Sequence, residues 1–202
     1  MKVPALPQFY GWSKAVSFFR RPGPRNLFGL TVRSLSPVPA GRGELPALEC
    51  LWLPYYLVRV ATRFGTTRDV KAMAVDSWGG SAVITEQWPD IQPREVDDRD
   101  LLPHRLSADE AIECARKALF AFFARGRAQL ARPAVEDALE TTLYYHPYWV
   151  LYRRMLLKHG MAIDLMDAYA GASCGGQVRH AVLNALVRWH AASRKTEDTS
   201  ER

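Results

Sequence analysis

A histidine set among tyrosines is the first place in this sequence where side chains could do chemistry. His146 stands beside Pro147, and Tyr144, Tyr145 and Tyr148 surround it. An imidazole in such a setting can act as a general base or relay a proton, because its pKa is easily moved across neutrality. No serine or cysteine nucleophile is close to it in the sequence. We therefore favour a structural histidine within an aromatic cluster, with an acid–base site as the alternative.

Two aspartates occupy matching places along the chain. Asp76 and Asp167 each follow a predicted strand and precede a turn that contains glycine. Two such carboxylates could share a site. An aspartate in this position can instead accept hydrogen bonds from the backbone N–H groups that follow it, which fixes the turn. We favour turn fixing, and we keep His146, Tyr148, Asp167 and Asp76 as candidates for lining a small-molecule pocket.

The remaining metal-ligating residue types are scattered. Cys50, Cys114 and Cys174 form no C-x-x-C pair, and His180 and His190 fall on nearly opposite faces of one predicted helix. This spacing predicts no metal site and no bound cofactor. An odd number of isolated cysteines is typical of a reducing compartment, where thiols serve as small core residues.

The elements that must position these side chains occur twice. Residues 51–58, LWLPYYLV, recur at 144–151 as YYHPYWVL, and residues 75–81, VDSWGGS, recur at 166–172 as MDAYAGA. An internal repeat indicates architecture before it indicates function. Each copy predicts a hairpin, because a strand rich in aromatic and β-branched residues is followed by a glycine-containing turn and a returning strand.

Helices are predicted around these hairpins. Ser107 and Glu110 form a capping box at the start of the clearest helix, whose apolar residues recur on one face. A short helical segment is expected at 133–139, and a last helix at 177–192. We therefore predict an α+β fold in which the two hairpins form an antiparallel sheet with the helices packed on one face.

The predicted domain organisation follows from these elements. Residues 1–45 form an irregular preface with one short helix, and residues 46–106 contain the first hairpin repeat and a linker. Residues 107–192 contain a helix, the second hairpin repeat and the last helix. Residues 193–202 are a polar, disordered tail. Residues 46–192 form one compact domain.

The second repeat resembles a PepSY-type domain over residues 107–171. The helix begins with Ser107-Ala108-Asp109-Glu110-Ala111, and the hairpin contains Tyr148-Trp149-Val150-Leu151 and then Asp167-Ala168-Tyr169-Ala170-Gly171. The first copy extends the resemblance to a tandem repeat. What the resemblance implies is a non-catalytic module that works by contact. Members of that family are usually exported or membrane-attached, whereas this chain shows no export signal.

An aromatic and arginine-rich surface is the predicted binding site. Tyrosine, tryptophan and arginine are enriched in binding hot spots, and alternation along each strand directs aromatic rings to both faces of the sheet. One face would pack on the helices and the other would meet a partner, unless both faces are covered within one core. The candidates are Trp52, Tyr55, Arg59, Arg63, Tyr148, Trp149, Arg153 and Arg154.

The leading functional hypothesis is a non-enzymatic accessory protein that binds a protein partner and dimerises through an exposed hairpin edge. One alternative is a small-molecule-binding protein or enzyme with a pocket near His146. Another is a nucleic-acid-binding module, since the net charge is +6 and the pI is about 9.4. No run of about 18 apolar residues indicates a transmembrane segment. A cytoplasmic location is therefore expected.

Overall fold

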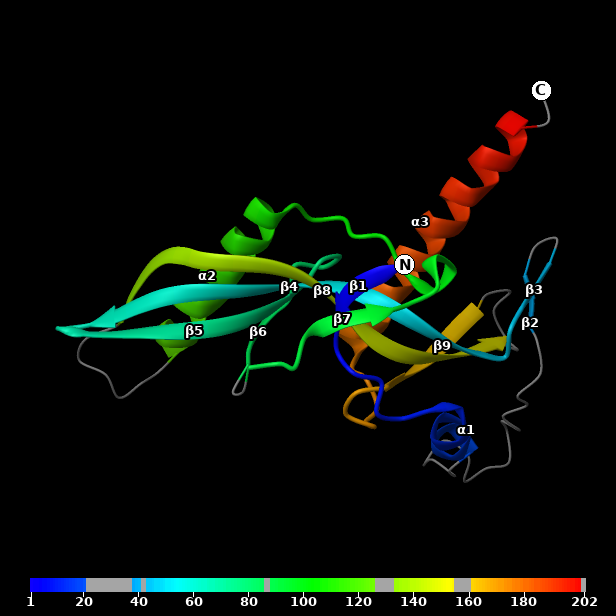
Figure 1. The fold of residues 1–202 in the computed structure, drawn as a ribbon, viewed down its shortest axis with the longest axis horizontal. Helices are drawn as coiled ribbons and strands as arrows, with labels where there is room; N and C mark the ends of the chain where they lie inside the picture. The colour runs from blue at the N-terminus through cyan, green and yellow to red at the C-terminus, as the bar shows by residue number, and fades with distance from the viewer. Residues whose placement is uncertain (21–37, 41–42, 86–87, 126–132, 155–160, 201–202) are drawn as a thin grey trace.

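The computed structural model describes residues 1–20, 38–40, 43–85, 88–125, 133–154 and 161–200. In these ranges, three α-helices pack against a seven-stranded sheet (Figure 1). The strands β2 (Val38–Ala40) and β3 (Gly43–Leu45) form a separate two-stranded sheet. The predicted α+β class is confirmed.

Two long antiparallel strands form the centre of the large sheet, β4 (Leu48–Phe64) and β8 (Ala134–Arg154). The sheet continues beyond β4 through β5 (Thr67–Asp76) and β6 (Ala82–Ile84), whereas β9 (Met161–Asp167) pairs with β8. Two short strands complete it, β1 (Lys2–Ala5) and β7 (Gln92–Glu95). Residues 51–58 of β4 are all buried, as expected of a strand that is covered on both faces.

Both predicted hairpins form. β4 turns into β5 at Gly65, whose φ of 59° lies in the left-handed region that favours glycine. β8 pairs with β9, and the turn predicted between them falls on residues 155–160, outside the described ranges. The helical segment expected at 133–139 is wrong, because Val135 and Ala138 pair with β4. Pairing with a long neighbouring strand outweighs the weak local preference for helix.

The strand pairings of the two hairpins correspond to each other about one point, the Leu53–His146 pair, which we call the two-fold axis. Leu53 pairs with His146, its own counterpart in the other copy. Tyr55 pairs with Asp76 in the first hairpin, just as Tyr148 pairs with Asp167 in the second. The bonds after the strands also match, since Asp76 N donates to the carbonyl of residue 81 at 2.9 Å and Asp167 N to that of residue 172 at 2.8 Å.

The segments that precede the first two helices are related to each other by the same two-fold axis. Leu6 N donates to Tyr145 O and Leu102 N donates to Trp52 O, both at 3.0 Å. A few residues later, Tyr10 N donates to Ala168 O at 3.0 Å and Leu106 N to Ser77 O at 2.9 Å. Each lead-in segment is therefore bonded to the hairpin of the other half of the molecule.

Each of the first two helices consequently packs against the hairpin of the other half of the molecule. Helix α1 (Trp12–Arg20) precedes β4, yet its Phe19 packs with Trp149 and Met166 of the second hairpin. Helix α2 (Ala108–Arg125) precedes β8, yet its Leu119 packs with Val58 and Met73 of the first hairpin. The predicted capping box of α2 is present, since Ser107 N donates to Glu110 Oε2 at 2.8 Å and Glu110 N donates to Ser107 Oγ at 3.3 Å.

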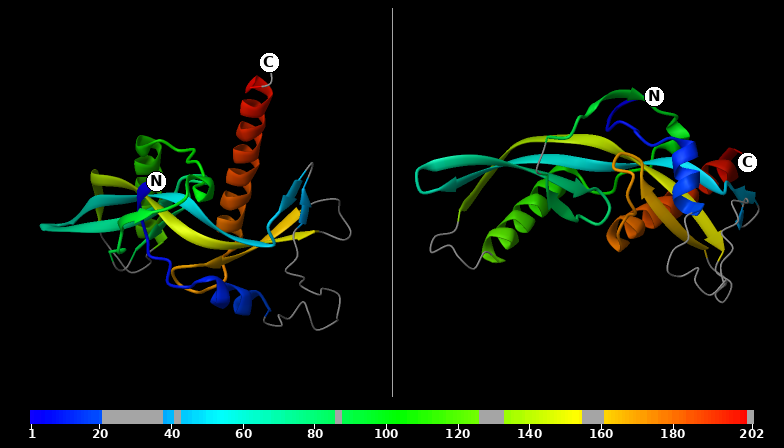
Figure 2. Two further views of the ribbon diagram at one scale, coloured as in Figure 1. Left: turned by 45° about the vertical axis from the view of Figure 1, so that its right-hand side comes forward. Right: turned by 90° about the horizontal axis from the view of Figure 1, so that it is seen from below.

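Helix α3 (Gly176–Ser200) contacts the alternate residues of β4. Its Val182 and Leu186 belong to the cluster that contains Leu53 and Leu57, whereas α2 packs against Val58. Successive residues of a strand point to opposite faces, so α2 and α3 contact different faces of β4. This differs from the expected packing of the helices on one face. Figure 2 shows α3 leaving the body of the molecule towards Ser200, where a disordered tail was expected.

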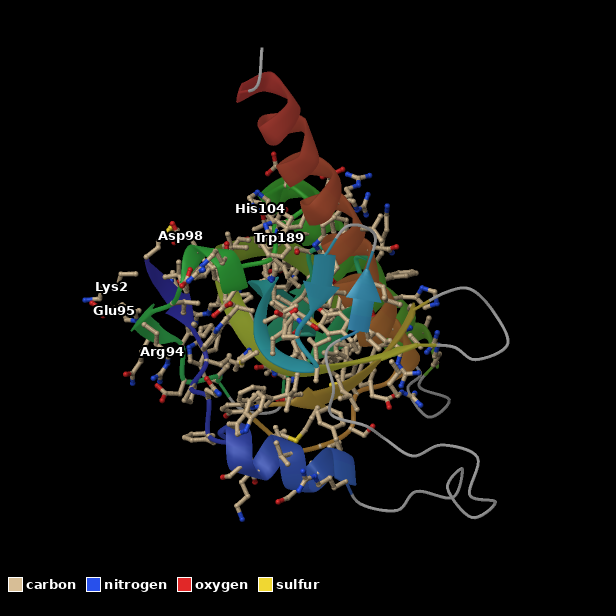
Figure 3. The ribbon with its side chains drawn as sticks, turned by 90° about the vertical axis from the view of Figure 1, so that its right-hand side faces the viewer. Lys2, Arg94, Glu95, Asp98, His104 and Trp189 are labelled. Atoms are coloured by element: carbon tan, nitrogen blue, oxygen red, sulfur yellow. The ribbon has the colours of Figure 1, made fainter. Side chains whose placement is uncertain are left out.

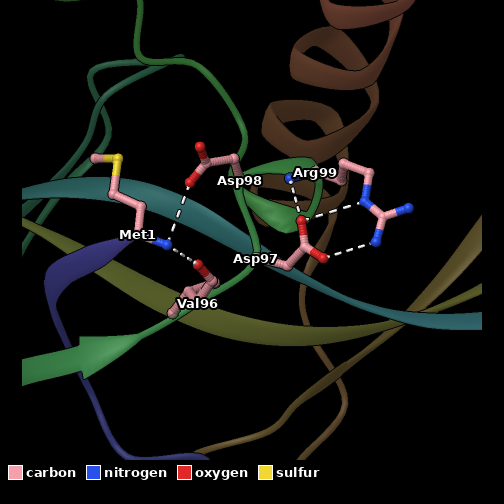
Figure 4. Close-up of polar contacts among 5 residues, drawn as sticks. All are labelled: Met1, Val96, Asp97, Asp98 and Arg99. Carbon is pink, nitrogen blue, oxygen red and sulfur yellow. Dashed lines mark hydrogen bonds and ion pairs between the residues drawn. The ribbon is translucent and has the colours of Figure 1, made fainter.

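The N-terminal segment belongs to the sheet and is not a separate preface. β1 pairs with β7 and forms one parallel bridge to β8. The Met1 amino group donates to Val96 O at 2.7 Å and lies 3.4 Å from the Asp98 carboxylate (Figure 4). Asp97 accepts a bond from Arg99 N and caps the short 3-10 helix η2 (Asp98–Asp100). A contact separated by 95 residues therefore anchors β1.

The edge of β7 carries features that oppose strand addition. Figure 3 shows Lys2, Arg94 and Glu95 at this border of the sheet, and Pro93 has no N–H group to offer a further strand. Charges and proline are the usual means by which proteins blunt an edge strand. In the part of the chain that the structure describes, no helix is both long enough and apolar enough to cross a lipid bilayer.

Candidate functional site

The aromatic side chains proposed as a binding surface lie in the core. Trp52, Tyr55, Tyr148 and Trp149 are only 4–8% exposed. The aromatic surface predicted from these residues is therefore wrong. At these four positions both faces of β4 and β8 are covered, which is the alternative arrangement that the sequence left open.

Two contacts explain this burial. Trp52 packs with Val3 and Val96, which the pairing of β1 and β7 brings over it. Trp149 lies beneath α1, and its indole Nε1 donates to Tyr10 O at 2.6 Å. The covering segments are distant in sequence from both strands, so strand periodicity could not reveal them.

Three of the candidate arginines bind carboxylates, and they lie at opposite ends of the sheet. Arg59 pairs with Glu140 at 3.0 Å at the end where β4 meets β5. Arg63 pairs with Glu136 at 2.9 Å at the same end. At the other end, Arg153 pairs with Asp164 at 2.7 Å. Arg154 pairs through its backbone with Met161. Tyr55 and Arg59 are alternate residues on one face of β4, but the aromatic side chains are buried, so the arginines and the aromatics form no common exposed surface.

Three of the candidate pocket residues, His146, Tyr148 and Asp167, come together close to the two-fold axis, whereas the Asp76 carboxylate bonds to its own turn. His146 Nε2 lies 2.9 Å from Asp167 Oδ1, and the imidazole stacks on Tyr148 with ring centroids 4.5 Å apart and planes 11° apart. The hydroxyls of Tyr55 and Tyr148, counterparts in the two copies, are 3.1 Å apart. Tyr144 stacks on Tyr55. We call the group of His146, Asp167, Tyr148, Tyr55 and Tyr144 the axis cluster.

Burial controls the protonation of the axis cluster. It raises the pKa of the phenols Tyr55, Tyr144 and Tyr148, so these remain protonated hydrogen-bonding groups. Burial also opposes the charge of Asp167, but the hydrogen bond and charge of His146 and two backbone N–H groups together lower the pKa of that carboxyl. The result is a carboxylate that orients an imidazole, the arrangement in which a histidine can act as a general acid or base.

Both aspartates fix turns, as the sequence predicted. Asp76 Oδ1 accepts from Trp78 N at 2.9 Å and Oδ2 accepts from Gly79 N at 2.8 Å. Asp167 Oδ1 accepts from Tyr169 N at 2.8 Å and Ala170 N at 2.9 Å. Only Asp167 has an imidazole partner, because the counterpart of His146 is Leu53.

The nearest thiol is poorly suited to nucleophilic attack. Cys174 packs against the core cluster that contains Tyr55 and Tyr148. Burial, followed by the charge of Asp167, raises the pKa of its thiol to about 12. The thiolate is the reactive form of cysteine, so at neutral pH this side chain behaves as an apolar core residue.

An exposed apolar group was missed in the sequence. Val70, Val83 and Trp88 are 40%, 58% and 56% exposed. Val83 pairs with Ala74, which pairs with Leu57. Val70 pairs with Ala61, four residues further along each strand on the same face. The alternation of Val70, Ala72 and Ala74 indicated a strand face, but it could not indicate that this face is left open.

Comparison of the chain with protein-family models, curated proteins and solved structures gives no match. Within the described residues, no group of three or more histidine, cysteine, aspartate or glutamate side chains is arranged to hold a metal ion. The functional argument therefore depends on the axis cluster and on the exposed face of β5 and β6.

Proposed function

We propose that this chain is a non-enzymatic accessory protein that binds a protein partner by contact. The observation that carries the proposal is an exposed apolar face formed by Val70 of β5 and Val83 of β6, with the Trp88 ring beside it against the Arg59 guanidinium. We call it the open face. Exposed apolar groups that share one face are typical of interaction sites, whereas isolated ones are normal on any protein surface.

The chemistry of the buried groups supports contact in place of catalysis. Burial raises the pKa of the Cys50 and Cys174 thiols to about 12 and keeps the tyrosines of the axis cluster protonated. The three free cysteines accord with a reducing, cytoplasmic location, which is part of the proposal. The resemblance of residues 107–171 to PepSY-type domains points in the same direction, towards a module without a catalytic centre.

Affinity purification of the tagged chain from its native host, with and without nuclease, tests this function. We expect one protein to be recovered in stoichiometric amount after nuclease treatment. A Val83→Lys variant should lose that protein, because a charge on the open face opposes apolar contact. Phe122→Lys is the matched control, since Phe122 on α2 and Val83 are both 58% exposed. Recovery of the chain alone, or of nucleic acid in place of protein, would overturn the proposal.

The His146–Asp167 pair favours one second candidate, a small-molecule site. An oriented imidazole stacked on Tyr148 and edged by Tyr169, with ring centroids 6.1 Å apart, can bind and protonate a polar ligand. Thermal denaturation with a panel of metabolites tests it. A ligand that stabilises the wild type and not a His146→Gln variant would support this site, and stabilisation of both or of neither would exclude it.

A further inference from the structure

Helix α3 packs on one face of the second half of the molecule, where the strand residues are buried. Val150, Tyr152, Ile163 and Leu165 lie in the same core cluster as the α3 side chains, and each is at most 2% exposed. Val150 pairs with Leu165 and Tyr152 pairs with Ile163, so the four residues form two adjacent rows of one sheet face.

The corresponding rows of the first half are only partly covered. The counterparts are Leu57 paired with Ala74, and Arg59 paired with Ala72. Leu57 and Ala74, the row nearer to the two-fold axis, are buried, whereas Arg59 and Ala72 are partly exposed. Val83 extends the row of Leu57 and Ala74, and Val70, which pairs with Ala61, lies in the next row beyond Arg59 and Ala72. The Trp88 ring lies 5.1 Å from the Arg59 guanidinium and borders them.

The difference arises because the two copies diverge after the last matching strand. In the second copy, Ser173 forms a bridge to Met166 and the chain then enters α3 at Gly176. In the first copy, Ala82 pairs with Val75 in the same way, but the chain continues towards β7. The first half therefore has the sheet face that a helix covers in the second half, without a following helix of its own.

We propose that the open face receives an amphipathic helix from the protein partner, placed over the first half as α3 is placed over the second. This inference rests on the proposed function and names the element that docks. A helix is the occupant argued for because the same rows of the same sheet are covered by a helix on the other side of the axis.

The side chains of the open face specify the apolar side of that helix. Ala72 and Ala74 occupy the positions that correspond to Ile163 and Leu165 in the second half. Because each alanine side chain is smaller by several carbon atoms, the surface of the sheet lies lower at these positions. Helix α3 contributes two alanines, Ala181 and Ala185, to the core cluster that contains its bulky rows. A helix that fills the lower surface at normal packing density needs leucine, methionine or phenylalanine at these contacts.

Charge specifies the rim of the docked helix. Within the described ranges, Arg59, Arg63 and Arg68 flank the open face and pair with two carboxylates, Glu136 and Glu140. Arg63 and Arg68 are also largely exposed, at 59% and 66% of their side chains. One positive charge is left in excess, so we expect glutamate or aspartate along one flank of the partner helix.

Site-specific photo-crosslinking in the native host tests this inference on the full-length chain. A photoreactive amino acid replaces Val83 in one variant, Val70 in a second and Phe122 in a third, which serves as the control. We expect crosslinks from positions 83 and 70, and at least tenfold fewer from position 122. The crosslinked peptide should come from one protein and should have apolar residues at helical spacing with acidic residues on one flank.

The outcomes separate this inference from the proposed function. A partner that crosslinks through position 122 and not through 70 or 83 would retain the proposed function and overturn helix docking. A crosslinked peptide with strand periodicity, or one from a second copy of this chain, would also overturn it. The absence of crosslinks at all three positions, together with purification of the chain alone, would overturn both.

Discussion

At the scale of single residues, the two copies act as internal controls for each other. Where the first copy has Ser77, fully buried, the second has Ala168, also fully buried. The Ser77 hydroxyl finds no hydrogen-bond partner among the described residues. A buried hydroxyl without a partner is destabilising, because its hydration is lost without replacement.

Ser77→Ala should therefore preserve or increase stability. Removing an unsatisfied buried hydroxyl is expected to raise the free energy of unfolding by up to about 1 kcal/mol, and the reverse change Ala168→Ser should lower it by about 1–3 kcal/mol. Urea denaturation followed by circular dichroism measures both. A clear loss of stability in Ser77→Ala would show that the hydroxyl has a partner in solution.

The two turn aspartates should respond to pH with opposite signs. The pKa of Asp167 is lowered in the folded protein, so its stabilising effect is present above the unfolded pKa of about 3.9 and is lost as the pH falls through the folded value. The pKa of Asp76 is raised by burial despite two backbone bonds, so its contribution is present at low pH and is lost as the pH rises through its folded value.

Asparagine variants measure this difference. Between about pH 3 and pH 6 the cost of Asp167→Asn, relative to wild type, should grow as the pH rises, since only wild type gains the charged hydrogen bonds, whose typical net worth is about 1.5–3 kcal/mol. The cost of Asp76→Asn should shrink over the same range. Denaturant titrations at four or more pH values give both trends. Parallel curves for the two variants would contradict the assigned pKa directions.

At the scale of elements, two glycines close the matching turns. Gly80 and Gly171 have φ values of 69° and 70°. A Cβ on Gly171 would lie 2.6 Å from the Tyr10 ring, and one on Gly80 would lie 2.8 Å from Cys114 Sγ. Gly65 has φ 59° but open space around it. These positions separate backbone strain from steric conflict.

Alanine substitution at these glycines should therefore have graded effects. Gly65→Ala is expected to cost about 1–2 kcal/mol from the left-handed backbone alone. Gly171→Ala should cost more, roughly 2–4 kcal/mol, because overpacking against Tyr10 adds to that strain. Thermal and chemical denaturation measure the series. Equal losses at both positions would show that Tyr10 moves aside without cost.

Local patterns in the sequence predicted the local structure. The turn aspartates, the Ser107 capping box and both hairpins depend on residues that are close in sequence, and all are present. The burial of Trp52 and Trp149 was not predictable in the same way. Trp52 is covered by β1 with β7, and Trp149 is covered by α1. These contacts join residues that are more than 40 positions apart in the sequence, so they leave no periodic pattern in the strands themselves.

At the scale of the whole molecule, the crossing of α1 and α2 joins the two halves. Each helix precedes one hairpin and covers the other. A substitution that weakens the packing of one helix should therefore loosen the hairpin that this helix covers. The hairpin that follows the helix in the chain should be affected less. The Phe19 and Leu119 side chains, 1% and 0% exposed, are the central contacts of the two helices.

Truncating these side chains tests the crossing. Phe19→Ala is expected to cost about 3–5 kcal/mol and Leu119→Ala about 2–5 kcal/mol, since both leave cavities. In native-state hydrogen exchange, Phe19→Ala should speed exchange in β9, around Met166, more than in β5. Leu119→Ala should do the reverse, around Met73. Because the predicted patterns are opposite, a general loss of stability cannot produce both. Faster exchange in the hairpin that directly follows each altered helix would contradict the crossed arrangement.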